Sequence, residues 1–191
     1  MYHQAALKIA REIGYRYGEV TALSRLSFLF HEQQFNFAEA FANDQQRLQL
    51  DSTNFSFQAD FAEKHFTTGR FPAAEKRLAA LLANPEVSAS TKIALAAIQI
   101  ANKLAQNKTQ QVPAALETLQ QTIASQPDSF QVGTIFNGTK HFISQNEKLA
   151  PYRAWLLQLF TAMEIKDGRD AILAALREVR EKFSKREGER K

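Results

Sequence analysis

The sequence predicts an all-α fold built as a stacked array of helix hairpins. Apolar residues recur with helical spacing through the 191 residues, and no segment shows a convincing two-residue alternation bounded by turns. The five prolines all fall where the helical segments start or stop, which is where proline is tolerated. Small and aromatic residues between Gly69 and Pro85 recur in part between Ala115 and Pro127. Such repetition is typical of helical arrays.

The composition is that of an ordinary water-soluble protein. With 45% hydrophobic and 23% charged residues, the chain can bury a core in one extended domain or two small ones. No apolar run approaches the roughly 20 residues that cross a bilayer, and Lys8, Arg11 and Arg16 make the N-terminus too charged for a signal peptide. The absence of cysteine excludes a disulfide framework and a cysteine nucleophile. We therefore expect a cytoplasmic protein with no membrane contact.

The net charge of +4 is concentrated at the C-terminus. Residues 177–191 hold seven basic and four acidic side chains, so the rest of the chain is close to neutral. A nucleic-acid surface needs clustered Lys and Arg that are not matched by Glu. The charge distribution therefore argues against nucleic acid as a partner.

Ten helices are expected from the apolar periodicity. In order they span Tyr2–Ile13, Gly18–Glu32, Asn36–Gln49, Ser52–Thr67, Pro72–Ala83, Ser88–Gln106, Val112–Ala124, Asp128–Ser144, Pro151–Met163 and Arg169–Lys185. Gly14 and Gly69 stand where a left-handed residue would end the first and fourth helices. Candidate N-caps precede the fourth, sixth and eighth helices, as Asp51 or Ser52, Ser88 or Ser90, and Asp128 or Ser129.

The fourth helix carries two apolar stripes rather than one. The stripes are Phe55, Ala59, Ala62 and Phe66, and Phe57, Phe61 and His65. Two stripes predict a helix that packs between its own hairpin partner and the next repeat. The last helix, in contrast, is apolar at Ile172, Leu176 and Phe183 and charged elsewhere, which suits a helix that caps the array.

These residues resemble the tetratricopeptide repeat family. One complete repeat is matched by Phe61, Ala62, Phe66, Gly69, Phe71, Ala74, Leu78, Leu81 and Pro85. A second is matched by Ala97, Ile100, Ala101 and Leu104 in its first helix and Ala115, Leu119, Thr122 and Pro127 in its second. The stretch from Tyr2 to Leu23 is similar to a longer-period variant of the repeat. The resemblance covers residues 1–127, although Asp44 and Gln45 stand where apolar residues are expected and 106–111 looks like an insertion.

The resemblance implies a solenoid of about four to five antiparallel hairpins. Residues 1–127 would form the repeats, opening inside the second helix of a first repeat that we expect to be truncated, as in a piece of a longer protein. Residues 128–186 would form either a degenerate repeat with its capping helix or a separate three-helix cap. Residues 187–191 would form a charged tail.

Catalytic and metal-binding patterns are missing from the sequence. The four histidines lack metal-ligand spacing, and His31-Glu32 lacks the second histidine that a zinc-binding helix requires. His31 and His65 lie one 34-residue period apart, which favours equivalent packing positions in successive hairpins. There is no glycine-rich phosphate loop and no nucleophile elbow. We therefore expect no enzymatic activity, no cofactor and no metal.

The resemblance places ligand contacts on the concave face of the array. Carried over to this chain, the groove would be lined by Thr21, Ser24, Phe28, His31, Ala59, Glu63 and Phe66. It lacks the lysine and asparagine set with which some family members hold an acidic C-terminus, so an apolar or aromatic-anchored peptide fits better. Phe28 and Phe66 could instead pack between repeats.

The function predicted from the sequence is that of a non-catalytic scaffold or adaptor that binds a protein or peptide. Two alternatives stay open. The chain could self-associate into a homo-oligomer through an apolar end of the array. It could also be a regulatory or sensor domain that binds a small ligand between helices.

Overall fold

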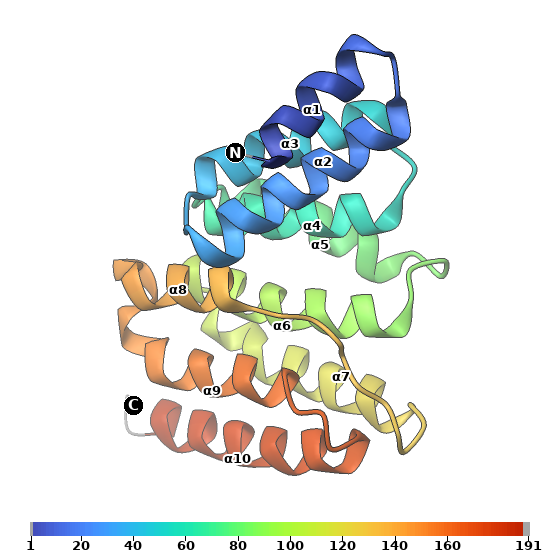
Figure 1. Cartoon of the computed structure of the whole chain (residues 1–191). Helices are drawn as coiled ribbons and strands as arrows, with labels where there is room; N and C mark the ends of the chain where they lie inside the picture. Colours follow the sequence, from blue (N-terminus) through green and yellow to red (C-terminus); the bar gives the residue numbers. More distant parts are fainter. Residues whose placement is uncertain (1, 189–191) are drawn as a thin grey trace.

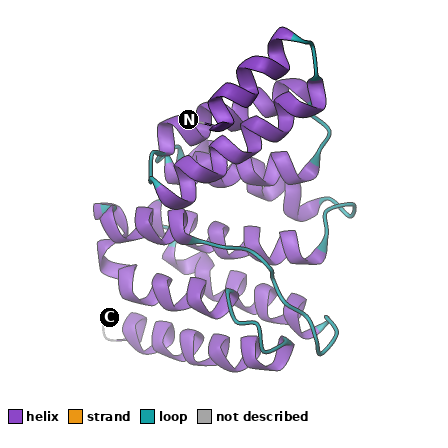
Figure 2. Ribbon diagram, in the orientation of Figure 1, coloured by secondary structure: helices purple, strands orange, loops and turns teal. Residues whose placement is uncertain are grey.

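The computed structural model describes residues 2–188, and these residues confirm the all-α prediction (Figure 2). The helices are α1 (Tyr2–Glu12), α2 (Arg16–Phe28), α3 (Phe37–Leu50), α4 (Phe55–Thr67), α5 (Phe71–Ala83), α6 (Ala89–Ala105), α7 (Val112–Ala124), α8 (Asn137–Gln145), α9 (Arg153–Met163) and α10 (Arg169–Gly188). A π-helical turn, η1 (Leu29–Gln33), extends α2, and two short 3₁₀ turns are η2 (Thr109–Gln111) and η3 (Glu147–Tyr152). No strand occurs between residues 2 and 188.

Helices α1 to α7 pack in chain order, each against the next, as in a helical repeat array (Figure 1). The path then changes. After α7 the chain runs back along α6, and α8 packs against η1 and α4 in the first half of the molecule. Helix α9 packs against α6 and α10, while α10 packs against α7. Helix α8 therefore returns to the first half of the array, whereas α9 and α10 lie beside α6 and α7 at the far end (Figure 1).

Local sequence explains most of the helix boundaries. Gly14 and Gly69 have φ angles of 68° and 73°, which confirms the predicted left-handed stops. The Ser88 side chain accepts a hydrogen bond from the Thr91 amide and caps α6, as predicted. Asn54, rather than Asp51 or Ser52, caps α4 by accepting from the amides of Ser56 and Phe57. Asp51 instead accepts from Thr53 in the preceding turn.

The predicted helix over 128–144 is wrong in its first half. Residues 128–136 are irregular, and α8 begins at Asn137, so neither Asp128 nor Ser129 caps a helix. Gly133 has a φ of 71°, which breaks a right-handed helix. The segment is held instead by contacts with the start of α10, where the Arg169 amide donates to the Asp128 carbonyl at 2.9 Å.

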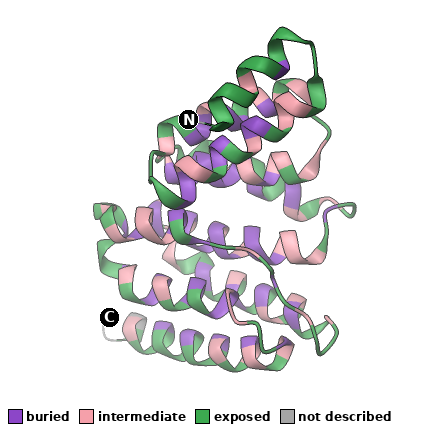
Figure 3. Ribbon diagram, in the orientation of Figure 1, coloured by how far each residue is buried: buried purple, intermediate pink, exposed green. Residues whose placement is uncertain are grey.

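A contiguous apolar core runs from Ala59 in α4 to Phe183 in α10. Figure 3 shows how the buried residues are distributed along the helices. Ala62 and Ala74 are fully buried, and their small side chains permit α4 and α5 to approach closely. The indole N–H of Trp155 donates to the Val179 carbonyl at 2.6 Å and ties α9 to α10.

Helix α10 buries Ile172, Leu176, Val179 and Phe183, and its other face is largely exposed. This is the single apolar face expected of the terminal helix. Residues 189–191 of the predicted charged tail lie outside the described residues. Within the described chain, no helix combines the length and apolarity that crossing a membrane demands.

Cooperative unfolding of this core is testable with Leu78→Ala. Leu78 is fully buried in α5, so the substitution should lower the free energy of unfolding by about 2–5 kcal/mol. Because Leu78 and Trp155 belong to the same core, the transition of the single tryptophan's fluorescence should shift together with that of the circular dichroism. Leu82→Ala, at a half-buried position of the same helix, is the control and should cost less. A fluorescence transition that does not move would contradict a continuous core.

Candidate functional site

The structure divides the seven predicted groove residues into two groups. His31, Ala59, Glu63 and Phe66 are buried, and they lie against α8 and the segment that precedes it. The other three, Thr21, Ser24 and Phe28, all lie on α2. Thr21 and Ser24 donate their hydroxyl protons to carbonyls of α2 itself, and the Phe28 side chain remains 44% exposed.

Helix α8 covers the groove between η1 and α4. The ring of Phe142 sits among three other rings, with centroid distances of 5.9 Å to Phe37, 5.1 Å to Phe66 and 6.4 Å to Phe71. Farther along the groove, Phe136 is fully buried and lies beside residues of α4 and α6. In this structure the chain's own residues therefore occupy the position expected for a peptide ligand.

Two buried carboxylates hold the N-terminus of α8. The Gly138 amide donates to Glu32 Oε2 at 3.0 Å, and the Thr139 hydroxyl donates to Glu63 Oε1 at 2.6 Å. The first turn of a helix has amides without helical partners and the positive end of the helix dipole, so it stabilises negative charge. Glu32 belongs to η1, and π-helical turns of this kind are frequent at functional sites.

Glycine is required at position 138 by the close approach of α8 to His31. A β-carbon at Gly138 would lie 2.5 Å from ring atoms of His31 and from its carbonyl oxygen. The His31 ring in turn contacts Glu32, with Nδ1 2.5 Å from Oε1. Both side chains are buried. The small residue thus lets the helix N-terminus reach the carboxylates.

Buried cations compensate the carboxylates on the other side. The Lys64 ammonium lies 3.0 Å from Glu63 and 4.0 Å from Asp44, and Arg47 bonds Asp44 at 2.5 Å and Asp60 at 3.2 Å. Burial alone would raise the pKa of Glu63, but the Lys64 charge and the Thr139 hydrogen bond contribute to lowering it to about 2. The same pair acts in reverse on Lys64: burial alone would lower its pKa, and the neighbouring carboxylates raise it above its usual range.

His31, Glu32 and Glu63 form the single group of three histidine or acidic residues in the described chain with ligand atoms within 4.8 Å of one another. Every carboxylate oxygen of this group already has a partner. Glu32 contacts His31 and Gly138, while Glu63 contacts Thr139 and Lys64. The arrangement is therefore built to hold α8 in place.

Sequence reasoning missed the role of Gly138, Thr139 and Phe142. These residues fall inside a predicted helix, and nothing in their spacing indicates that they reach back to η1 and α4. The available signal was weak: Asn137-Gly138-Thr139 is a run of poor helix formers, which could have marked a helix start rather than a helix interior.

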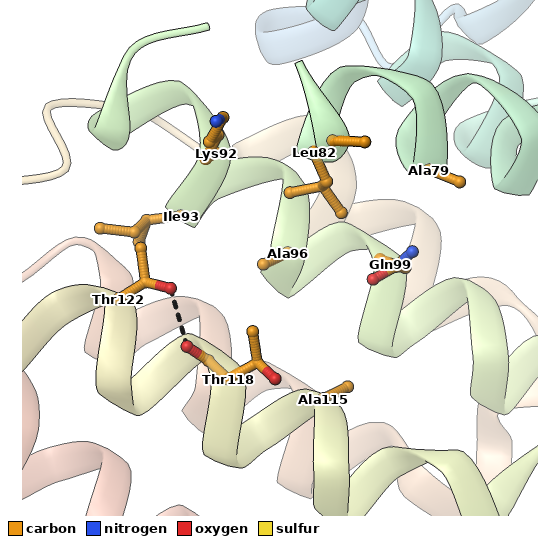
Figure 4. A pocket seen from close by; sticks show the side chains of 10 residues that line it. Ala79, Leu82, Lys92, Ile93, Ala96, Gln99, Ala115, Thr118 and Thr122 are labelled. Carbon is orange, nitrogen blue, oxygen red and sulfur yellow. Dashed lines mark hydrogen bonds between the residues drawn. The ribbon is translucent and has the colours of Figure 1, made fainter. Parts of the chain in front are cut away.

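A pocket of about 440 Å³ opens between α5, α6 and α7 (Figure 4). Alanine, leucine and isoleucine form much of its wall, and Lys92 is its sole charged lining residue. The hydroxyls of Thr118 and Thr122 donate to carbonyls of their own helix. Small-molecule sites combine apolar walls with convergent polar groups that fix the ligand. This pocket has few polar groups that are free to bind one.

The largest exposed apolar surface lies on the first hairpin. We call it the first-hairpin face; its large apolar side chains are Tyr2, Ile9, Ile13, Tyr15 and Tyr17, each more than half exposed. A shallow pocket of about 530 Å³ lies between α1 and α2 on this face. Elsewhere in residues 2–188, the other large exposed apolar side chains are Phe28, Phe35 and Ile135. The first-hairpin face is therefore the main apolar surface without cover.

Comparison with protein family models, curated proteins and solved structures gives no match to this chain. The tetratricopeptide resemblance thus rests on the residues that carry it.

Substitution of Gly138 by alanine should loosen α8. Because the added β-carbon meets the His31 backbone as well as its ring, we expect a loss of about 1–3 kcal/mol in the free energy of unfolding. Limited proteolysis should then cut faster within residues 125–136. Gly188→Ala is the matched control, because a β-carbon there meets no atom within 4 Å. Equal stability of the two variants would show that the close approach at Gly138 does not hold α8.

The pKa of Glu63 predicts a defined acid sensitivity. Between pH 4.5 and about 2 the unfolded chain binds a proton at Glu63 that the folded chain does not, so stability is lost as the pH falls through this window. Glu63 should contribute up to one proton to the slope, which is about 1 kcal/mol per pH unit. Urea unfolding of wild type and Glu63→Gln at several pH values measures it, and the variant should show a smaller slope below pH 4.5.

His65 supplies an internal control for that titration. Burial first, and then the charges of Arg77 and Arg70, lower the pKa of His65 from 6.5 to about 4. Its protonation therefore destabilises the folded chain as the pH falls from 6.5 towards 4. This part of the profile should be the same in wild type and Glu63→Gln. An identical slope below pH 4.5 would contradict the role of Glu63.

Proposed function

We propose that this chain is a cytoplasmic protein-binding module without catalysis of its own, and that it binds through the first-hairpin face. The observation that carries the proposal is the exposure of five large apolar side chains on one hairpin, namely Tyr2, Ile9, Ile13, Tyr15 and Tyr17, of which the last four line one shallow pocket. Their exposed fractions are 91%, 56%, 70%, 52% and 72%. Contiguous apolar patches of this kind mark interaction sites.

The composition of the face supports a protein partner. Tyrosine is enriched at protein interfaces because it combines a large apolar ring with a polar tip, and three of the five side chains are tyrosines. The face is broad and shallow rather than enclosed, which suits a protein surface better than a small molecule. The groove that could have competed for a peptide is covered by α8.

A small-ligand sensor is less well supported. Such a role needs a pocket with convergent polar groups, and the pocket between α5, α6 and α7 has two threonines whose hydroxyl protons are donated within α7. The buried carboxylates are likewise engaged by α8. Protein binding through the first-hairpin face is therefore better supported than small-ligand binding.

Ile9→Lys should strongly weaken partner binding. A charge in the middle of the apolar face should lower the amount of partner captured from lysate at least about tenfold, which corresponds to ~1.4 kcal/mol. Ile9 is exposed, so the helix content should not change. Quantitative mass spectrometry of proteins captured by wild type and variant measures the effect.

Ile135→Lys is the matched control, since Ile135 has nearly the same exposure, 53% against 56%, outside the first-hairpin face. It should capture the same proteins as wild type. Loss of capture in both variants, or in neither, would place binding elsewhere and overturn the proposal.

A further inference from the structure

The register of α1 against α2 can be followed at Gly18, which lies against the Tyr15 ring and faces Ala10 of α1. A β-carbon at Gly18 would lie 3.3 Å from the Ala10 β-carbon, so these two positions face each other across the hairpin. Seven residues make about two helical turns, and a step of seven from each position leads to His3 and Arg25. Both residues line the shallow pocket on this face. They therefore lie across from each other at the open end of the hairpin.

The opposite end of the face, next to the turn between the helices, is aromatic. Tyr15 and Tyr17 lie there with ring centroids 6.1 Å apart, beside Ile13. Ile9 lies near the middle of the face. The first-hairpin face thus has one end with His3 and Arg25 beside Tyr2, an apolar centre at Ile9, and an opposite end with the tyrosine pair Tyr15 and Tyr17.

Arg25 has no ion-pair partner within the part of the chain that the structure describes. Other cations on this hairpin do have acidic partners: Arg11 pairs with Glu19 at 2.7 Å, and Lys8 lies 3.8 Å from Glu12. Arg25 is exposed at the edge of an apolar surface. A guanidinium in this position can bind the face of an aromatic ring.

We propose, resting on the function proposed above, that the partner at the first-hairpin face is a second copy of this chain, related to the first by a two-fold axis that runs across α1 and α2. A two-fold interface uses the same patch on both copies, so that patch must complement itself. The first-hairpin face does so because its two ends carry complementary groups.

The choice of axis follows from the charges. A two-fold axis across the helices exchanges the two ends, so that Arg25 of each copy lies over Tyr15 and Tyr17 of the other. A two-fold axis along the helices would keep the ends in place and bring the two Arg25 side chains together, which like charge disfavours. The crosswise axis also places Ile9 next to its own counterpart. The apolar centre of each copy is then covered by the apolar centre of the other copy.

Sedimentation velocity over a concentration series tests the proposal on the whole chain. Wild type should show a reversible monomer–dimer equilibrium. Ile9→Lys should be monomeric, because it places two ammonium groups next to each other at the axis. Arg25→Ala should weaken the dimer by roughly five- to thirtyfold, since the symmetric contact occurs twice. Ile135→Lys should behave as wild type. A dimer that persists in Ile9→Lys would overturn the proposal.

Single cysteines in this cysteine-free chain test the axis directly. With oxidised glutathione as the oxidant, Ile9→Cys should form a disulfide-linked dimer, because a disulfide needs Cα atoms within about 7 Å. Tyr2→Cys should not, because about 10 Å of helix separates each Tyr2 from the axis. Equal cross-linking at both positions would overturn the crosswise axis.

The two proposals fail in different ways. A wild-type chain that stays monomeric, while Ile9→Lys still loses a captured protein of another kind, would overturn the second copy as partner and leave the first-hairpin face as a binding site. A monomeric wild type whose captured proteins are unchanged by Ile9→Lys would overturn both.

Discussion

The fold depends on the hydrogen bonds between the N-terminus of α8 and the buried carboxylates of Glu32 and Glu63. They hold α8 against the first half of the array after the chain has turned back from α7. Buried carboxylates are costly unless they are paired and hydrogen-bonded. Here the helix N-terminus supplies donors on one side and Lys64 supplies positive charge on the other. Removing one partner would leave a buried charge without compensation, which is why this contact constrains the arrangement of α8.

The helices up to α7 could be predicted because local patterns decide them. Apolar periodicity, the prolines and the left-handed glycines at 14 and 69 each act within a few residues. The return of the chain after α7 could not be predicted in the same way. It depends on the contact between Glu32 and Gly138, which are 106 positions apart, and on the left-handed backbone at Gly133. A helical pattern over 128–144 does not reveal either feature.

The candidate site was predictable only in part for a related reason. The resemblance put His31, Glu63 and Phe66 in a groove, and the structure buries all three, but a repeat pattern carries no information on what fills a groove. Phe142 and Thr139 fill it here. Likewise, the apolar stripe of α1 can be read from sequence, whereas its lack of cover is a tertiary property. The groove is covered by α8, and the proposed binding surface moves from the groove between α2 and α4 to the exposed face of α1 and α2.

Hydrogen–deuterium exchange of the wild-type chain tests most directly the claim that α8 is an integral part of the groove. Exchange rates report local opening, and a docked helix opens only when its contacts break. The amides of α8 should exchange about as slowly as those of α4 and much more slowly than those of residues 128–136. Exchange of α8 as fast as that of the irregular segment would contradict it, because the groove would then be open to an external peptide for much of the time.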